Sequence, residues 1–419
     1  MAAKTGFHFW LSRSELREFN MADTAAGVRA PSAPWADDPL AYLLAPHAGD
    51  DFMARLYERE PLIIKRDDAK RYTPLLSIEA IDRLIAGVDL HEGQIDLANA
   101  NRTVQRTEYI SSSGFIDRGV IARQFQSGST IILQQLHQMD STLSEFCRAV
   151  EHVFSCHVQT NIYLTPPNAQ GFKTHYDNHD VFVLQISGAK AWRLYNVSVD
   201  TPYRGEAFNS SVHKVGDLRE EFVLEAGDCA YVPRGMMHDA STAGEGPSLH
   251  ITVGFIVRTW AELMLEAVSE VAVKNIGFRR SLPPGYTHRD FDRKAAAEEF
   301  RRLARAIGDE ANLDASLDLM IDNFIRSRVP DTSGAVVDAA RAVKPKDRFQ
   351  ARAFTPWRLA DDGDVLVLIA PGGDIDFKPE DRDTLERALT GGPFKLSDLP
   401  GADEDMIRKL QAFGLVARI

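Results

Sequence analysis

The sequence predicts an α+β protein with a central sandwich or barrel of short antiparallel β-strands and helices on both sides of it along the chain. Two observations support this fold class. Between residues 157 and 257, short runs rich in β-branched and aromatic residues are separated by Gly, Pro or Asp. Before and after this region, apolar residues recur at spacings of three and four, as they do on one face of a helix.

The N-terminal elements follow from local signals. Residues 1–36 include the stretch ADTAAGVRAPSAP, which lacks apolar periodicity, so we expect a flexible segment. From residue 39 the spacing is helical, and PLIIKR at 61–66 reads as an extended piece. Ser77 is a plausible N-cap for a helix over 78–87 that Gly87 ends. Short strands should follow within 91–137, and then a helix over STLSEFCRAVEHVF, 141–154.

Six strands are expected in the central region, each short and bounded by residues that favour turns. They are HVQTNIYLT (157–165), DVFVLQI (180–186), KAWRLYNV (190–197), EEFVLEAG (220–227), CAYVP (229–233) and SLHITVGFIV (248–257). This number of short strands is typical of a double-sheet jelly roll of the cupin type, whose open end gathers side chains from several strands. A small-molecule site is therefore expected at the mouth of the barrel.

Three side chains in this region form a candidate metal site. His175 and Asp177 are two residues apart, so they would point to the same side of an extended strand. The strand CAYVP and the turn PRG give His238 a route back to the same mouth. Two imidazoles and one carboxylate on one face of a metal, with the opposite positions open, are typical of non-haem Fe(II) oxygenases.

Two nearby basic side chains, His179 and Lys190, have different predicted roles. His179 has the same strand parity as His175, but it stands where the chain should bend before DVFVLQI, so we predict that it does not bind the metal. Lys190 is a candidate point contact for a carboxylate inside the barrel. The alternative for Lys190 is a solvated lysine at the edge of a hairpin, and spacing alone leaves both possibilities open.

The motifs HYDNHDVFVLQISGAKAWRLY and FVLEAGDCAYVPRGMMHDA closely resemble those of the JmjC oxygenases of the ribosomal oxygenase group. The resemblance implies a JmjC barrel, a helical dimerisation region and a C-terminal winged-helix-like domain, within an Fe(II)- and 2-oxoglutarate-dependent protein hydroxylase that uses O2 and releases succinate and CO2. It implies a target His or Arg side chain on a protein or peptide, such as a ribosomal protein.

Carried over by position, the resemblance makes His175, Asp177 and His238 the iron ligands and Lys190 the partner of the 2-oxoglutarate carboxylate. It also implies further contacts with the cosubstrate. These fall on two strands, at Asn161, Tyr163, His250 and Thr252. A lysine rather than an arginine at the cosubstrate position tilts the comparison toward the histidine-hydroxylating members of the group.

The predicted domains are a flexible segment 1–36, a catalytic domain 37–257, a helical dimerisation region 258–345 and a winged-helix-like domain 346–419. Helical spacing in TWAELMLEAVSEVAVKNI and FDRKAAAEEFRRLARAIG supports the third part, which in the related proteins forms a homodimer. In the last part, a strand VLVLIAP precedes two helices, and the final one begins ADEDM. Its acidic start argues against direct DNA binding.

Composition and charge limit the partners and the location that we expect for the protein. The formal charge of −12 argues against a nucleic-acid footprint along the whole chain and suits a basic partner segment. No stretch is apolar enough to span a bilayer and no secretion signal is recognisable, so we expect no membrane association and a cytoplasmic location. Three irregularly spaced cysteines indicate buried, reduced thiols.

Two other functions remain open from the residues alone. A metal-dependent cupin enzyme acting on a free small molecule would need neither Lys190 nor 2-oxoglutarate. A non-catalytic cupin module could hold a structural metal, although structural zinc prefers four protein ligands and only three are evident here.

Overall fold

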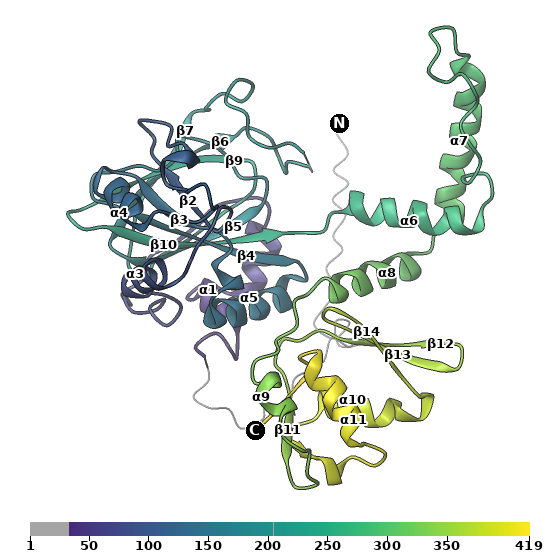
Figure 1. The fold of residues 1–419 in the computed structure, drawn as a ribbon. Coiled ribbons are helices and arrows are strands. Elements are labelled where there is room, and N and C mark those ends of the chain that lie inside the picture. The colour runs from purple at the N-terminus through teal and green to yellow at the C-terminus, as the bar shows by residue number, and fades with distance from the viewer. Residues whose placement is uncertain (1–32, 204) are drawn as a thin grey trace. The chain divides into compact units, whose positions relative to one another are not determined.

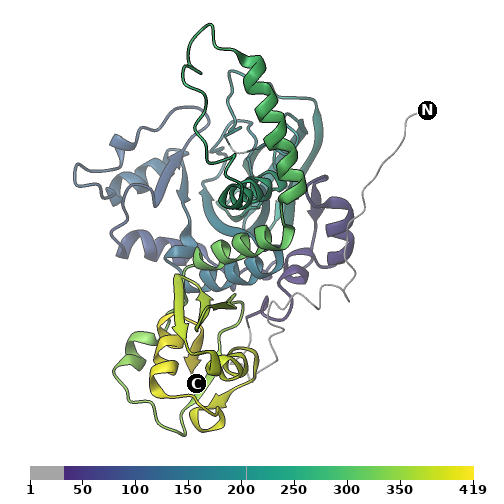
Figure 2. The same ribbon diagram turned by 90° about the vertical axis from the view of Figure 1, so that its right-hand side faces the viewer.

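The computed structural model describes residues 33–203 and 205–419, which form two units that divide along the chain between Val257 and Arg258 (Figures 1 and 2). The first unit contains the β-rich region, and the second contains a group of helices followed by small sheets. Within the described ranges, no helix combines the length and the apolar character that a bilayer span requires. Most of the predicted 1–36 segment lies outside these residues.

A seven-stranded antiparallel sheet is the larger layer of the first unit. Its strand order is β1-β8-β5-β10-β4-β3-β2. The interior strand β5 is buried on both faces, which explains its apolar run VFVL, whereas β4 alternates between half-buried and buried positions. The bounds are β1 Leu62–Ile64, β2 Ile95–Ala98, β3 Thr130–Leu133, β4 His157–Thr165, β5 Asp180–Ser187, β8 Cys229–Val232 and β10 Ser248–Ile256.

A three-stranded sheet in the order β7-β6-β9 faces the larger sheet and completes the jelly roll (Figure 1). Its strands are β6 Ala189–Val197, β7 Leu218–Glu225 and β9 Met236–Ala243. A core cluster joins apolar side chains of both layers, among them Val183 of β5 and Trp192 and Leu194 of β6. Burial of this shared surface holds the two sheets face to face.

Gly188 connects the two layers through the β5–β6 turn. It has φ 65°, and a Cβ at this position would stand 2.1 Å from the carbonyl oxygen of Pro247. Only a residue without a side chain fits both conditions. The tight turn therefore sends β6 back along the barrel with Lys190 near its start.

Helices cover the first unit beside the sheets. They are α1 Pro39–Leu44, α2 Gly49–Asp51, the π-helical turn η1 Phe52–Leu56, α3 Ile78–Gly87, the 3₁₀ turns η2 Arg106–Glu108 and η3 Leu136–Gln138, α4 Arg118–Gln126 and α5 Ser141–Phe154. The predicted N-cap is confirmed, because the Ser77 hydroxyl accepts a hydrogen bond from the Ala80 amide. The predicted end of α3 at Gly87 is confirmed as well.

Packed structure begins before residue 36, which was the predicted end of the flexible segment. Trp35 is buried and its ring lies edge-on to Phe146 of α5, at 5.5 Å between ring centroids. The prediction that residues 33–36 belong to the flexible segment was therefore wrong. It relied on the helix-breaking composition of APSAP and gave too little weight to the single Trp that follows. All three cysteines are free and buried, as predicted.

The second unit begins with a group of helices. They are α6 Trp260–Lys274, α7 Arg293–Glu310, α8 Leu313–Arg326 and the short α9 Ala335–Ala339. Thr259 caps α6 in a capping box with Glu262, whose side chain returns to the Thr259 amide. Helix α6 packs against both α7 and α8, while α7 has no buried residue of its own.

The C-terminal part holds two three-stranded sheets, β15-β11-β16 and β12-β13-β14, around a core that includes α10 and α11. The bounds are β11 Arg348–Ala351, β12 Arg358–Asp362, β13 Val365–Ala370, β14 Gly373–Phe377, the 3₁₀ turn η4 Pro379–Asp381, α10 Arg382–Thr390, β15 Phe394–Lys395, the 3₁₀ turn η5 Leu396–Asp398, α11 Glu404–Ala412 and β16 Val416–Arg418.

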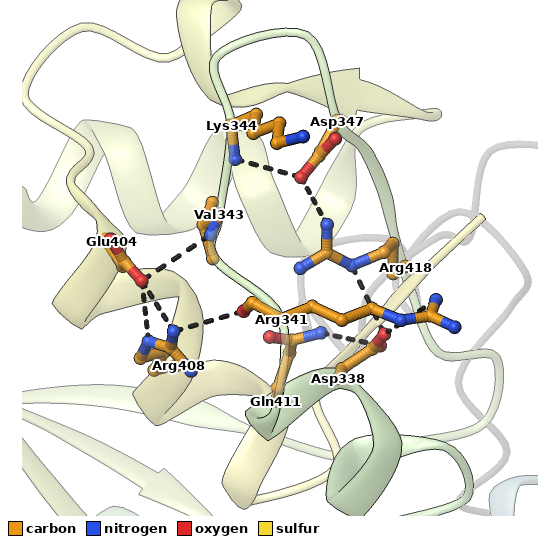
Figure 3. Close-up of polar contacts among 9 residues, drawn as sticks. All are labelled: Asp338, Arg341, Val343, Lys344, Asp347, Glu404, Arg408, Gln411 and Arg418. Atoms are coloured by element: carbon orange, nitrogen blue, oxygen red, sulfur yellow. Dashed lines mark hydrogen bonds and ion pairs between the residues drawn. The ribbon is translucent and has the colours of Figure 1, made fainter.

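Polar contacts attach the segment after α9 to this core (Figure 3). The Arg418 guanidinium pairs with Asp338 at 3.2 Å and also with Asp347. Arg408 of α11 donates to the carbonyl oxygen of Arg341 at 3.1 Å. These contacts fix residues 338–347 against the last helix and the last strand.

Candidate metal centre

Three side chains meet at the mouth of the barrel, as the sequence predicted they could. The ligand atoms of His175, Asp177 and His238 all lie within 4.8 Å of one another. The Asp177 carboxylate is 4.0 Å from His175 Nε2 and 3.8 Å from His238 Nε2. A small inward movement of these side chains would bring all three donor atoms to about 2 Å from one ion.

The hydrogen bonds of the two imidazoles suit metal binding. His175 Nδ1 lies 2.8 Å from the carbonyl oxygen of Lys173, and His238 Nδ1 lies 3.0 Å from that of Met236. A carbonyl oxygen only accepts, so each Nδ1 carries the proton and each Nε2 presents a lone pair to the shared space. The tautomer that a metal requires is therefore set by the backbone.

Charge and burial act together on this site. Burial would raise the pKa of Asp177, but the imidazoles of His238, His179 and His175 outweigh that effect and hold its pKa below the ordinary value. Burial and the neighbouring His175 lower the pKa of His238. Both shifts favour an ionised carboxylate beside a neutral imidazole, which are the forms that bind metal.

The backbone brings the ligands together by a route that differs from the prediction. His175 and Asp177 do not lie in a regular strand; they precede β5 in a loop, where His175 forms an isolated antiparallel bridge with His238. The His175 amide donates to the His238 carbonyl at 3.0 Å, and the His238 amide donates back at 2.7 Å. His238 itself lies on β9, a strand that was not predicted because MMHDASTA lacks strand-like alternation.

Lys190 extends from β6 into the interior behind the metal ligands. Its side chain is 4% exposed, so the alternative of a solvated hairpin lysine is wrong. Nζ donates to Thr165 Oγ1 at 3.1 Å and lies 3.4 Å from His250 Nδ1, and Lys190 forms no ion pair within the described residues. Burial lowers its pKa to about 7.

A pocket joins Lys190 to the three ligands. Its remaining wall includes Tyr163, His250 and Thr252, whose positions the family resemblance had indicated. Tyr163 and His250 stack with their ring planes 6° apart at 4.8 Å between centroids. Burial lowers the pKa of His250, and the adjacent Lys190 lowers it further, so this imidazole is neutral.

Asn161 lies outside this pocket. It lines a neighbouring polar cavity that shares only Tyr163 and Phe172 with the first, and its side-chain oxygen accepts from the Gln135 amide at 3.0 Å. The cosubstrate role expected for Asn161 is therefore not supported by its position. Asn161 shares strand parity with Tyr163, but Tyr163 lines both cavities, whereas Asn161 lines only the neighbouring one.

His179 lies apart from the ligand group, in agreement with the assignment made from sequence. Its ring packs against Gly254 of β10, where an added Cβ would stand 2.7 Å from His179 Cδ2. The candidate metal group within the described residues does not include it. The bend before β5 gives His179 this direction.

The sequence reading missed two groups at the pocket. Trp192 lines it, and its indole N–H has no hydrogen-bond partner among the described residues, as expected of a donor left for a bound polar molecule. Phe172 lies 5.6 Å from the His175 ring. The alternation of AKAWRLY could have identified Trp192, because it shares its strand face with Lys190, whereas Phe172 lies in an irregular loop without such a signal.

Comparison with known families agrees with this geometry. A model described as "JmjC domain" matches residues 132–263, which include all three ligands and Lys190. The chain therefore contains a JmjC domain. It is 33% identical over 306 residues to Ribosomal oxygenase 1 of Homo sapiens, covering 69% of this chain and 47% of that protein. This confirms the predicted resemblance to the ribosomal oxygenase group.

A second relative is matched over more of its length. The "bifunctional lysine-specific demethylase and histidyl-hydroxylase NO66" of Dictyostelium discoideum is 26% identical over 441 residues, covering 94% of this chain and 84% of that protein. By contrast, the chain spans about half the length of the human, bovine and rat Ribosomal oxygenase 1 proteins.

Solved structures support the JmjC fold. Escherichia coli ycfD matches with a TM-score of 0.53 at 15% identity, covering 89% of this chain and 99% of that one. The same enzyme in complex with cobalt and succinic acid gives a TM-score of 0.51 at 14% identity, over 89% and 98% of the two chains. At this identity the likeness concerns the fold.

The metal site gives a first prediction. His175→Ala should abolish tight binding of Co(II), because it removes one of three donors, whereas His179→Ala should leave binding nearly unchanged. Titration followed by the visible Co(II) absorption bands measures both. Equal losses of affinity in the two variants would show that His179 is a ligand.

Proposed function

We propose that this chain is an Fe(II)- and 2-oxoglutarate-dependent oxygenase that hydroxylates a side chain of a protein. One observation carries the proposal: an open three-ligand site lines the same pocket as a buried lysine that has no counter-ion in the described part of the chain. Three protein ligands leave coordination positions free for a cosubstrate and O2. A structural metal site would instead be closed by a fourth protein ligand.

The donor set fits Fe(II). When bound by His175, Asp177 and His238, the metal would supply the redox chemistry that couples oxidative decarboxylation of 2-oxoglutarate to hydroxylation, with O2 as oxidant and succinate and CO2 as products. The protein's contribution is to orient both imidazoles through the Lys173 and Met236 carbonyl oxygens.

Lys190 would hold the distal carboxylate of 2-oxoglutarate. A buried ammonium without a carboxylate partner carries a desolvation cost, which an anionic ligand offsets. Thr165 is within hydrogen-bond distance of Lys190 Nζ and keeps it in place. The Trp192 indole N–H offers a further donor at the pocket wall. The pocket thus provides one cation, one polar donor and a metal site, which suits a small dicarboxylate.

A protein target is proposed because the relatives are named for such targets: Ribosomal oxygenase 1 and a histidyl-hydroxylase. The polar cavity beside the pocket, which contains Gln134, Gln159 and Asn161, offers hydrogen bonds that an extended peptide could use. A His or Arg side chain of a ribosomal protein is the proposed target. The net charge of −12 suits such a basic partner.

The predicted division of the chain is retained within this proposal, except that the catalytic domain 37–257 also takes in the packed residues 33–36. It is followed by a helical dimerisation region 258–345 and a winged-helix-like domain 346–419. Exposed apolar side chains support a homodimer. Trp260 and Met264 lie one turn apart on α6, and Phe300 of α7 is 73% exposed. For the C-terminal domain, Glu404 and Asp405 at the start of α11 would repel phosphates, which favours a supporting role over DNA binding.

The activity is tested by reconstituting the protein anaerobically with Fe(II) and adding 2-oxoglutarate, O2 and peptides from ribosomal proteins. Succinate should be released in proportion to peptide that gains one oxygen by mass spectrometry, and His175→Ala should produce neither. Metal binding without turnover of 2-oxoglutarate would instead favour a small-molecule cupin enzyme or a non-catalytic module.

The position of Lys190 predicts a pH dependence of cosubstrate binding. In the free protein its pKa is about 7, whereas a bound carboxylate favours the ammonium and raises that pKa. Binding therefore takes up a proton above pH 7, and affinity for 2-oxoglutarate should fall by up to about tenfold per pH unit until the pKa of the bound state is reached.

Calorimetry on Mn(II)-loaded protein between pH 7 and 9 measures this slope. Lys190→Arg keeps its charge throughout, so whatever affinity remains should vary little with pH. Lys190→Met should abolish 2-oxoglutarate binding while retaining the metal. Wild-type affinity in Lys190→Met would refute the anchor.

The homodimer is tested separately by light scattering coupled to size-exclusion chromatography. Met264→Glu combined with Phe300→Glu should convert a dimer to a monomer, because two charges would be buried without partners. Val212→Glu, on an exposed loop of the first unit, is the matched control and should remain dimeric. A monomeric wild-type protein would contradict the proposal.

A further inference from the structure

Two buried carboxylates lie next to the metal ligands in sequence but outside the ligand group. Asp180 follows Asp177 by three residues, and Asp239 directly follows His238. The Asp180 side chain is fully buried and that of Asp239 is 2% exposed. Burying an ionised carboxylate is costly unless donors surround it, so the partners of these two groups show what their burial achieves.

The Asp180 carboxylate connects the loop that carries Asp177 to the turn that leads to His238. It accepts from Arg234 Nη1 at 2.6 Å and from the Tyr231 hydroxyl at 2.6 Å. Arg234 is itself buried and belongs to the PRG turn before β9. The next residue in that turn, Gly235, donates its amide to the Asp177 carbonyl at 2.9 Å. We call the Asp180–Arg234 ion pair the Asp180 link.

The Asp239 carboxylate makes a second connection on the other side of the ligands. One oxygen accepts from Thr174 Oγ1 at 2.7 Å and from the Tyr195 hydroxyl at 2.9 Å. The other accepts from Arg193 at 2.7 Å. Thr174 precedes His175, so this carboxylate joins strand β9 to the loop of the first ligand through one side-chain hydrogen bond. We call the Asp239–Thr174 hydrogen bond the Asp239 link.

The two links therefore bracket the His175–His238 bridge. In the Asp180 link, Asp180 lies three residues after Asp177 and Arg234 lies four residues before His238. In the Asp239 link, Thr174 and Asp239 are the sequence neighbours of His175 and His238. Backbone hydrogen bonds alone fix the register of the bridge but leave the loop free to tilt. The Asp180 and Asp239 links hold the loop on both sides of the bridge and so prevent this tilt. Such restraint matters because a metal site requires ligand positions held within about 0.5 Å.

We propose that the Asp180 and Asp239 links are positioning elements of the metal centre: they set the distance between the loop of His175 and Asp177 and strand β9, and thereby determine metal affinity. The inference rests on the proposed metal-dependent function. It assigns to Arg234 and Thr174 a role in that function, although neither belongs to the ligand group.

The test uses full-length protein and Co(II) alone, at low temperature where the variants remain folded. Arg234→Met, which breaks the Asp180 link, should weaken Co(II) binding by about tenfold or more and alter the visible absorption spectrum of the bound ion. Arg234→Lys should restore part of the affinity, because it retains the charge with a shorter reach. Thr174→Val removes the Asp239 link at nearly constant volume and should weaken binding to a smaller extent.

Lys65→Met is the matched control. Lys65 pairs with Asp228, another buried carboxylate of the same unit, whose partners lie away from the ligands. This variant should lower the unfolding midpoint of the metal-free protein while leaving Co(II) affinity and spectrum unchanged. The control separates a general loss of stability from a change at the metal centre.

Each outcome is decisive. If Arg234→Met and Thr174→Val lower the unfolding midpoint but bind Co(II) like the wild type, the links only stabilise the fold and the inference is wrong. If Arg234→Met does not fold, Thr174→Val alone decides by the same criterion. Wild-type protein that fails to bind Co(II) would overturn the proposed metal centre itself, and the inference with it.

Discussion

The antiparallel bridge between His175 and His238 is the interaction on which the rest of the site depends. Its two hydrogen bonds join a loop before β5 to the strand β9, which belongs to the opposite sheet. Each ligand then turns its Nδ1 toward a carbonyl oxygen two residues earlier in its own segment. The backbone thus sets both the spacing and the tautomers, and the side chains need little freedom of their own.

The rest of the pocket forms because the two sheets lie face to face. Lys190 reaches the interior because the Gly188 turn is tight enough for β6 to begin directly above the larger sheet. Thr165, His250 and Tyr163 come from β4 and β10, which pair in register across the floor of the barrel. Lys190 and His238 come from the smaller sheet, whereas Tyr163 and His250 come from the larger one, so a bound molecule would contact both layers.

Much of this could be predicted from the sequence. Strands such as DVFVLQI were recognisable because both faces are buried, and Ser77 was recognisable because capping is a local interaction. Strand β9 was missed because MMHDASTA lacks the alternation of polar and apolar residues that marks a half-buried strand. Asn161 was expected in the same pocket as Tyr163 because strand parity gives direction, whereas the limits of a cavity also depend on side chains such as Phe172 that come from irregular loops.

The burial of Lys190 affects the stability of the folded protein. A buried lysine with no counter-ion among the described residues lowers the stability of the empty protein, because either its ammonium is desolvated or its amine loses a proton. On the function proposed above, any anion that fills the pocket would stabilise the folded state by mass action.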